Sequence, residues 1–320
     1  MGCRSANRDN YGPMIQDRIN GVRIVLGPAL PEESPPASSQ SSGATEKVVL
    51  NIPPPASGGT RRALLIGVSD YLGFMSCLSS LFDVRALRER LIENGFEPEN
   101  VVALTTDEGP DKYPFKYKIE RELERLCEEA KPDDVVFVYF TGHGYVVDGR
   151  DYFLPMDVGY DGGIYLDVAL NEIARCGARY KFCLINAGRE TLESLDWVVK
   201  DAAPILSENA ESMKNCWTLY GGAPGEALLD FPNPKENGSL LTRAFLEGTT
   251  ELGDADGDGV VTVMEACRYA MKKTTENAEK YFGETQTPYL NVGVDDVDFA
   301  LILNPKKAEK KEENATQGEK

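Results

Sequence analysis

The chain has 320 residues, of which 42% are hydrophobic, and a formal net charge of -18 at pH 7 from 34 basic and 52 acidic side chains. That hydrophobic content is enough for a sizeable core, which excludes disorder over the whole chain. The negative charge argues against nucleic acid or an anionic membrane as the main partner, because both need a basic protein surface. It suits metal cations or basic peptides better.

The cysteines indicate a reducing compartment. Their number is odd, and no two of them have CxxC or zinc-ligand spacing: Cys3, Cys77, Cys127, Cys176, Cys183, Cys216 and Cys267. We therefore expect reduced thiols in a cytosol-like environment. No apolar stretch approaches the ~20 residues that a membrane-spanning helix needs. These features together predict a cytoplasmic protein.

Residues 1–60 are rich in Pro, Ser and Gly, a composition typical of a disordered leader or spacer. The start, Met1-Gly2-Cys3, allows lipid attachment in two ways: myristoylation of Gly2 with palmitoylation of Cys3, or a bacterial lipoprotein modification of Cys3. Ala6 stands where a myristoylation signal prefers Ser or Thr, and an unmodified terminus is the simpler interpretation. A membrane is expected as a partner only if Gly2 or Cys3 is lipidated.

After residue 60 the pattern changes to alternating strands and helices. Short apolar runs predict strands that are buried on both faces, at residues 63–68, 101–104, 135–140, 181–186 and 216–220. Helical spacing of apolar residues predicts helices at residues 78–94, 115–130, 166–174, 240–246 and 263–281. A hairpin is expected between the third strand and Pro155, and residues 305–320 form a charged, disordered tail.

This alternation predicts an α/β fold with a mainly parallel central sheet and helices on both faces. In such sheets, ligands and catalytic groups gather at the carboxyl ends of the strands. Residues that directly follow an expected strand are therefore the first candidates for a functional site.

His143 is the only histidine in the chain and follows the third expected strand in the sequence Thr141-Gly142-His143-Gly144. The flanking glycines allow a tight backbone path and close approach of a substrate. A histidine at a strand end can act as a general base or acid, because its pKa lies near neutral pH. The alternative is an ordinary surface-loop histidine.

Two stretches around this histidine make a family resemblance specific. Residues 140–145 and 151–157 resemble the histidine strand and hairpin of caspase- and metacaspase-like cysteine peptidases of the bacterial type. Further stretches resemble other parts of that family in the right order along the chain: residues 61–71, 83–87, 216–227 and 238–245. The resemblance covers most of residues 61–304. It implies a caspase-like fold and cysteine endopeptidase chemistry.

In that family the nucleophilic cysteine follows the fourth strand in a pattern close to Asp-Ala-Cys-Arg. The matching residues here are Asn186-Ala187-Gly188-Arg189, so Gly188 occupies the cysteine position. Glycine has no side chain that could attack a carbonyl carbon, which excludes covalent catalysis in this register. The oxyanion donor that the resemblance implies is a backbone amide near Gly144, which does not depend on the missing thiol.

Another cysteine could in principle serve as the nucleophile. Cys183 lies inside the fourth strand, roughly 16 Å before Gly188 at the rise of a strand. Cys176 lies in the preceding loop, and Cys77 is expected on the first helix. We interpret all three thiols as structural.

The resemblance also implies a pocket for the side chain before the scissile bond. Metacaspases favour Arg or Lys there, and the matching positions are Asp83 and Asn186, with Thr141 nearby. Asp83 keeps one negative charge, but Asn186 cannot form a bidentate ion pair with a guanidinium. A weakened preference for basic residues follows. The alternative is that Asp83 is an ordinary solvated helix residue.

Residues 254–265, with the sequence DADGDGVVTVME, match a twelve-residue EF-hand calcium loop at every key position. Carboxylates stand at positions one, three, five and twelve, a backbone carbonyl at seven and a hydroxyl at nine, from Asp254, Asp256, Asp258, Glu265, Val260 and Thr262. Gly259 permits the sharp turn at position six. The loop predicts one Ca²⁺ site, and the alternative is an Asp/Gly turn that caps the next helix without metal.

The sequence therefore predicts a catalytically silent caspase-like domain that binds a peptide or regulates a protein partner, such as an active homologue, and holds one Ca²⁺. The second hypothesis is an active, calcium-linked endopeptidase, in which Gly188 is an introduced change or another cysteine enters the site. A third is a calcium-dependent structural adaptor for which His143 is dispensable.

Overall fold

The computed structural model describes residues 59–303, with gaps at 74, 148, 192–215 and 293–297. Almost all of the predicted leader and the whole predicted tail lie outside the described residues, and so do the lipidation positions Gly2 and Cys3.

The described part of the chain alternates strands and helices along its length. Its strands are β1 (Arg61–Gly67), β2 (Val101–Thr105), β3 (Val135–Gly142), β4 (Gly144–Val147), β5 (Arg150–Phe153), β6 (Ile164–Tyr165), β7 (Tyr180–Ala187), β8 (Glu190–Thr191), β9 (Trp217–Tyr220), β10 (Val260–Thr262), β11 (Tyr289–Asn291) and β12 (Ala300–Leu303). Its α-helices are α1 (Ser79–Glu93), α2 (Lys116–Glu129), α3 (Val158–Asp161), α4 (Leu166–Arg175), α5 (Pro234–Asn237), α6 (Leu240–Gly248) and α7 (Val263–Phe282).

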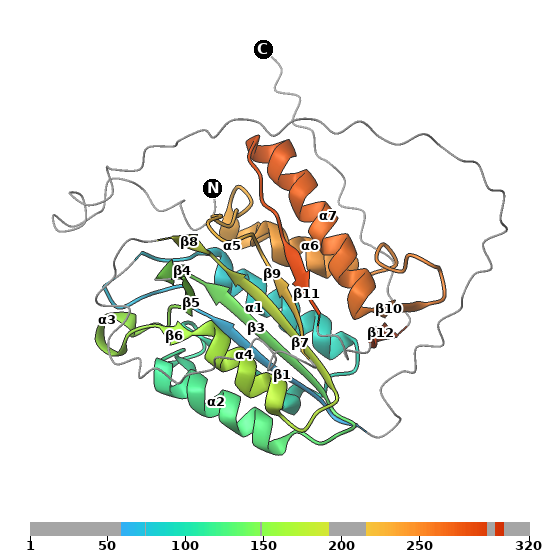
Figure 1. Ribbon diagram of the computed structural model, residues 1–320, viewed down its shortest axis with the longest axis horizontal. Coiled ribbons are helices and arrows are strands. Elements are labelled where there is room, and N and C mark those ends of the chain that lie inside the picture. Colours follow the sequence, from blue (N-terminus) through green and yellow to red (C-terminus); the bar gives the residue numbers. More distant parts are fainter. Residues whose placement is uncertain (1–58, 74, 148, 192–215, 293–297, 304–320) are drawn as a thin grey trace, which may run out of the picture. The chain divides into compact units, whose positions relative to one another are not determined.

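The central sheet has the strand order β11-β9-β7-β3-β1-β2 (Figure 1). Every neighbouring pair from β9 to β2 is parallel, and only β11 runs antiparallel to its neighbour. The two central strands, β3 and β7, are buried along their whole length. A parallel sheet needs cover on both faces, which explains why these strands are mainly apolar.

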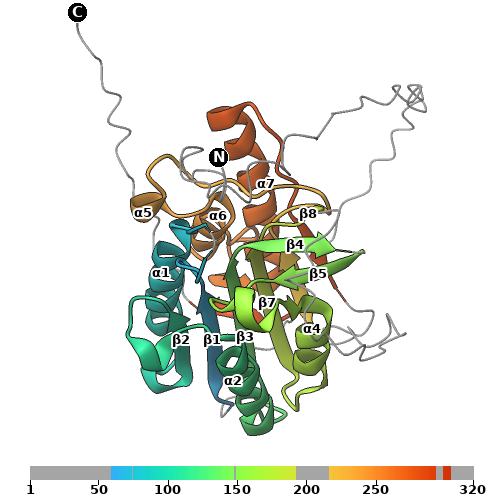
Figure 2. The same ribbon diagram turned by 90° about the vertical axis from the view of Figure 1, so that its left-hand side faces the viewer.

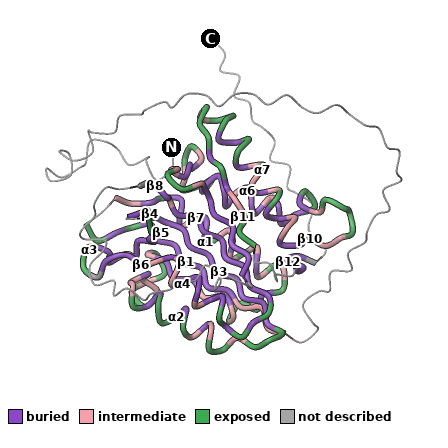
Figure 3. The backbone as a smooth tube through the Cα atoms, in the orientation of Figure 1, coloured by how far each residue is buried: buried purple, intermediate pink, exposed green. Residues whose placement is uncertain are grey.

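Two hydrophobic clusters cover the two faces of this sheet. On one face, apolar residues of α2 and α4 pack on alternate residues of β1, β3 and β7, such as Leu64, Val138 and Ile185. On the other face, residues of α1, α6 and α7 pack on the intervening residues, such as Leu65, Tyr139 and Leu184. Figures 1 and 2 show α2 and α4 lying together, and Figure 3 shows the buried strands between the helical layers.

Local capping fixes several helix ends next to this core. Thr262 and Glu265 form a capping box at the start of α7, and Gly283 ends that helix in the left-handed conformation with φ 60°. The Ser239 side chain accepts a hydrogen bond from the amide of Thr242 and begins α6. Asp83, a residue of the predicted pocket, lies on the first turns of α1, and Ser239 precedes α6, so these two helices carry one site between them.

The chain leaves the central sheet after β3 and builds a second, smaller one. Its strand order is β6-β5-β4-β8, with β4 and β5 as an antiparallel hairpin and β8 parallel to β4 (Figure 2). In the chain, β4 directly follows β3 and β8 directly follows β7. The small sheet therefore connects the carboxyl ends of β3 and β7. This junction holds His143 and Gly188.

The predicted α/β fold with a mainly parallel sheet and helices on both faces is confirmed, and each predicted strand and helix is present within a few residues of its expected bounds. One placement was wrong: Cys77 lies in the loop before α1, which begins at Ser79. The sequence did not reveal β11 and the β10–β12 pair, whose short strands depend on partners far away in the chain.

Candidate functional site

His143 is held at the carboxyl end of β3 by contacts with the loop after β1. Its backbone amide donates a hydrogen bond to the Tyr71 hydroxyl over 2.7 Å. The preceding Gly142 has φ 150°, and a Cβ there would lie 2.6 Å from the same hydroxyl. Residue 142 must therefore be glycine for Tyr71 to approach the backbone and fix the path of the chain through His143.

The imidazole of His143 is almost completely buried, with 3% of the residue exposed. Its Nε2 lies 3.0 Å from the carbonyl oxygen of Met75, and the ring contacts the aromatic rings of Tyr71 and Tyr145. A carbonyl can only accept, so Nε2 carries the proton and the lone pair lies on Nδ1. Burial lowers the pKa of His143 to about 4, although the hydrogen bond to Met75 opposes that shift. The ring is therefore neutral at pH 7.

Gly188 lies beside this histidine on the neighbouring strand. In the parallel register of β3 and β7, Gly142 pairs with Ala187, so the next residues, His143 and Gly188, leave the sheet side by side at a strand spacing of ~4.8 Å. A Cβ on Gly188 would meet one close neighbour, the carbonyl oxygen of Gly144 at 3.3 Å, and the backbone of Gly188 lies outside the left-handed region. The backbone at residue 188 therefore accommodates a side chain with only a small adjustment.

Gly144, by contrast, has no room for a side chain. A Cβ there would lie 2.6 Å from the carbonyl oxygen of Gly188, 2.9 Å from the Ala187 side chain and 3.0 Å from the carbonyl oxygen of Tyr152. The backbones of residues 144 and 188 approach each other this closely only because residue 144 is a glycine. The structure thus brings His143, Gly144 and Gly188 together, as the sequence predicted for the site.

Arg189 fixes the chain directly after Gly188, a role that the sequence analysis missed. Its guanidinium donates two hydrogen bonds to the Asp151 carboxylate of β5, Nε to Oδ1 over 2.7 Å and Nη2 to Oδ2 over 2.6 Å. It also lies against the stacked rings of Tyr220 and Tyr289 and donates to the Tyr289 hydroxyl. This bidentate pair ties the end of β7 to the hairpin that follows His143.

Three described cysteines have contacts with groups other than Gly188. Cys183 and Cys216 lie in the core with their Sγ atoms 3.4 Å apart. Cys77 contacts the hydroxyl groups of Ser79 and Ser80 at the start of α1. Cys77 is close in sequence to Met75, the hydrogen-bond acceptor of His143, and it is therefore the thiol that an experiment on a relocated nucleophile must test first.

The predicted pocket residues form one buried polar network. Asp83 accepts hydrogen bonds from the Asn186 amide over 3.2 Å and from the backbone amide of Ser239 over 3.0 Å. The Asn186 amide also contacts the hydroxyl groups of Thr141 and Ser239, at 3.2 Å and 2.8 Å. The structure therefore brings Asp83, Thr141 and Asn186 together.

The interpretation of Asp83 as a solvated helix residue is wrong, because 0% of it is exposed. Burial raises the pKa of Asp83 to about 6, while hydrogen bonds from Ser239, Thr242 and Tyr139 act in the opposite direction. The carboxyl is therefore mostly ionised at pH 7 but is protonated under mildly acidic conditions.

A second buried carboxyl, Asp230, lies next to this network and was missed from the sequence. It is 5% exposed, and its backbone forms an isolated β-bridge with Ser239. Burial raises the pKa of Asp230 well above its usual value, and the nearby charges of Cys77 and Asp83 add to the shift. Among the described residues, neither Asp230 Oδ2 nor Asn186 Oδ1 has a hydrogen-bond partner. The only signal in the sequence was one acidic residue in an otherwise apolar stretch, which is too common to identify a site.

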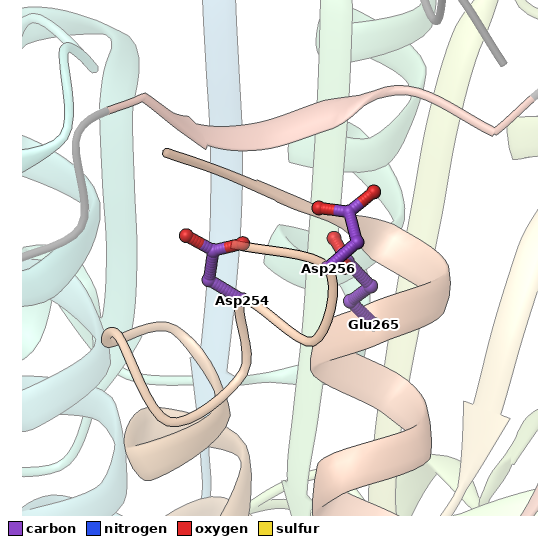
Figure 4. A group of neighbouring side chains, drawn as sticks. All are labelled: Asp254, Asp256 and Glu265. Carbon is purple, nitrogen blue, oxygen red and sulfur yellow. The ribbon is translucent and has the colours of Figure 1, made fainter. Parts of the chain in front are cut away.

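The loop at residues 254–265 gathers carboxylates at the start of α7 (Figure 4). One ligand oxygen from each of Asp254, Asp256 and Glu265 lies within 4.8 Å of the others. Gly257 and Gly259 have φ values of 74° and 83°, which the tight turn requires. An oxygen-only set with several carboxylates is the type of site that Ca²⁺ prefers.

The other three predicted ligands, Asp258, Val260 and Thr262, are not part of this group of three carboxylates. The Asp258 carboxylate accepts the backbone amide of Val260 over 2.8 Å, and Val260 begins β10. The Thr262 hydroxyl accepts the amide of Glu265 as the cap of α7. Glu265 therefore takes part both in the cap of α7 and in the group of three carboxylates.

Comparison with known proteins gives one family. A family model described as the caspase domain matches residues 60–296. The chain is 38% identical over 109 residues to metacaspase-1A of Aspergillus oryzae, 34% identical over 119 residues to metacaspase-1 of Candida albicans, and 30% identical over 162 residues to metacaspase-1 of Sclerotinia sclerotiorum. These alignments cover 33%, 35% and 50% of this chain but only 26%, 26% and 37% of the relatives.

Proposed function

We propose that this chain, which belongs to the caspase domain family, binds polypeptides through a buried acidic pocket and does not hydrolyse them. The observation that carries this proposal is Gly188. It lies beside His143 where the family's nucleophile is expected, and it offers no sulfur to attack a carbonyl carbon. The partner is a polypeptide, such as an active homologue of the same family.

The pocket supports binding of a basic side chain. Asp83 and Asp230 supply two carboxyls, and Asp230 Oδ2 and Asn186 Oδ1 are buried acceptors without a donor among the described residues. A guanidinium carries five N–H donors in a fixed plane and can satisfy several such acceptors at once. Asp230 thereby supplies a second carboxyl beside Asp83, and a bound cation would favour the ionised form of that carboxyl.

Binding requires the pocket to open. Asp83 has no exposed surface, and residues 238 and 239 lie directly against it: a Cβ on Gly238 would be 2.3 Å from Asp83 Oδ1, and Ser239 donates to the same oxygen. Movement of residues 230–239 away from α1 would expose both carboxyls together. Because a cation favours the ionised forms of Asp83 and Asp230, affinity for a basic peptide should fall below pH 6, where Asp83 becomes protonated.

The binding proposal is tested with two peptides that differ only by Arg or Gln at one position, using fluorescence anisotropy of the full chain at pH 8 and pH 5. We expect at least tenfold tighter binding of the Arg peptide at pH 8, a smaller preference at pH 5, and loss of the preference in Asp83→Asn and Asp230→Asn. The matched control is Glu97→Gln, a change at an exposed carboxylate. Equal affinity for both peptides would refute the pocket, and cleavage of either peptide would refute the silent site.

We propose Ca²⁺ as the cation of the loop at residues 254–265. The support is the full EF-hand spacing in the sequence and the three ligand oxygens within 4.8 Å of one another. Ca²⁺ at a hundredfold excess over its Kd should raise the Tm by roughly 5–10 °C, and Mg²⁺ should raise it less. Glu265→Gln keeps an acceptor for the cap but removes a charge, so it should abolish the Ca²⁺-dependent rise. An unchanged rise in that variant would contradict the proposed site.

Attachment to a membrane through lipid on Gly2 or Cys3 is also a proposal, supported by the sequence Met1-Gly2-Cys3 alone. Within the described residues, no helix combines the length and apolar character needed to cross a membrane. Mass spectrometry of the protein from its natural source would detect either lipid.

A further inference from the structure

A group of thiols lies on the face of the sheet covered by α2 and α4, away from His143 and Gly188. Cys127 is on the last turns of α2, and Cys176 directly follows α4. The two helices pack side by side (Figures 1 and 2). The Cys127 Sγ lies 3.8 Å from the carbonyl oxygen of Glu172, one helical turn before Cys176, and the thiols of Cys127 and Cys176 interact with each other. Cys127 on α2 therefore lies close to Cys176 at the end of α4.

A buried cation stands next to this pair. Lys181, near the start of β7, is 3% exposed, and its Nζ donates to the carbonyl oxygens of Ala174 over 2.6 Å and Cys176 over 3.2 Å. None of the ion pairs among the described residues includes Lys181. Its charge is therefore available to stabilise a thiolate close by.

The surroundings act unequally on the two thiols. The hydrogen bond from Cys127 lowers the pKa of Cys176 to about 7, helped by the backbone of Ala178 and the charge of Lys181 and opposed by burial. The same hydrogen bond, together with burial, raises the pKa of Cys127. Cys176 is thus suited to act as the nucleophile, and Cys127 to remain protonated as its neighbour.

A second thiol pair on the same face provides an internal comparison. The Sγ atoms of Cys183 and Cys216 are 3.4 Å apart, but these residues are 0% and 4% exposed, whereas Cys176 is 9% exposed and Cys127 is half-buried. Burial raises the pKa of Cys183 well above its usual value. Short separation alone does not make a thiol reactive, because the thiolate is the reacting form. The Cys183–Cys216 pair should therefore stay reduced under conditions that oxidise the other.

We propose that Cys176 and Cys127 form a peroxide-sensitive modification site in which hydrogen peroxide converts the two thiols into a disulfide between α2 and the end of α4. The Cys176 thiolate attacks one peroxide oxygen, the O–O bond breaks, and hydroxide leaves, which gives a sulfenic acid. The Cys127 thiol then attacks that sulfur, the S–O bond breaks, and water leaves. In total, two thiols and one H₂O₂ give one disulfide and two H₂O.

This site does not depend on the proposed function, because it lies apart from Gly188 and the acidic pocket. The disulfide would close a loop from residue 127 to residue 176 that contains β3, His143 and the β4–β5 hairpin. A crosslink across that loop restricts the unfolded chain and should raise the Tm of the oxidised protein.

The test begins with the reduced full chain, which is treated with increasing H₂O₂, blocked with iodoacetamide, digested and mapped by mass spectrometry. We expect a crosslinked peptide that joins Cys127 to Cys176, accompanied by a rise in Tm that dithiothreitol reverses. Cys176→Ser and Cys127→Ser should both lose the crosslink and the Tm rise. The matched control Cys267→Ser changes a buried thiol on the opposite face of the sheet and should keep both. Oxidation that links Cys183 to Cys216 instead, or no crosslink at all, would overturn the proposal.

A second measurement needs no substitution at either cysteine and is independent of their effect on folding. The rate at which iodoacetamide labels each cysteine of the native chain is followed by peptide mapping between pH 5.5 and 9. Cys176 should be labelled at least tenfold faster than Cys183 at pH 7, and its rate should rise with a midpoint near pH 7. Lys181→Gln should move that midpoint upward, while Lys181→Arg should keep it. A midpoint near that of an ordinary thiol in the unchanged chain would contradict the proposal.

Discussion

The two sides of the candidate site differ in which functional groups they contain. On the nucleophile side, His143 has its backbone anchor, its tautomer and its neighbouring Gly144, but Gly188 contributes no reactive group. On the pocket side, Asp83 is mostly ionised at pH 7, and Asp230 adds a second buried carboxyl, whose backbone pairs with Ser239, a hydrogen-bond partner of Asn186. In the function proposed above, binding and chemistry rest on different residues, so one substitution can remove hydrolysis and leave recognition in place.

The largest effect that this comparison predicts concerns the two glycines at the junction of β3 and β7. Gly144→Ala places a Cβ 2.6 Å from a backbone oxygen, whereas Gly188→Ala places one at 3.3 Å. We expect Gly144→Ala to reduce the free energy of unfolding by about 3 kcal/mol or more, and Gly188→Ala by about 1 kcal/mol or less. Urea denaturation of the two variants measures this difference. Equal losses would show that residue 188 is not the tolerant position that the structure describes.

His143 should make the protein less stable in acid. Its folded pKa of about 4 lies below the unfolded value of 6.5, so the unfolded state binds more protons between these pH values. The free energy of unfolding therefore rises with pH from 4 to 6.5, by up to roughly 3 kcal/mol from this group. His143→Gln should remove that rise. Urea titrations at several pH values give the slope, and an identical slope in wild type and variant would contradict the burial of a neutral imidazole.

Asp83 should act in the opposite direction over nearly the same range. Its folded pKa of about 6 lies above the usual 3.8, so the folded state binds more protons between these values. The free energy of unfolding falls by up to roughly 3 kcal/mol as the pH rises from 3.8 to 6. Asp83→Asn should remove this decrease and make the slope more positive than in wild type. The two variants should therefore depart from wild type with opposite signs between pH 4 and 6, and departures of the same sign would refute the comparison.

The smallest expected effect concerns the anchor after Gly188. Arg189→Lys keeps the charge but loses the bidentate contact with Asp151 and the planar contact with Tyr220 and Tyr289. We expect a loss of roughly 1–2 kcal/mol in the free energy of unfolding. The matched control is Arg121→Lys on the exposed side of α2, which should change stability by less than about 0.5 kcal/mol. If Arg189→Lys lowers the free energy of unfolding no more than Arg121→Lys does, the contact with Asp151 does not stabilise the end of β7.

The sequence was informative where local pattern determines structure. Buried strands such as β3 and β7 are mainly apolar runs, and α2 shows its apolar spacing clearly, so the sheet and its helices could be predicted. The position of Gly188 beside His143 also followed, because parallel neighbours bring their carboxyl ends together.

The sequence was less informative where contacts join distant segments. Asp230 and Asp83 are far apart in the chain, and the pairing of residues 229–231 with residues 238–240 brings the second carboxyl to the pocket. Arg189 meets Asp151 and Tyr289, which come from different elements on either side of it in sequence. The burial of Asp83 likewise depends on residues 238 and 239, which no helical pattern in α1 could reveal.

The central claim, that a single missing thiol separates this site from hydrolysis, is tested most directly by peptide turnover. Fluorogenic peptides with Arg, Lys or Asp before the scissile bond are incubated with the unchanged chain, with Gly188→Ala and with Gly188→Cys. The account predicts turnover only in Gly188→Cys, at least about a hundredfold above the other two, and its loss when His143→Gln is added. Turnover by the unchanged chain that persists in repeated preparations and disappears in His143→Gln or Cys77→Ser would contradict it.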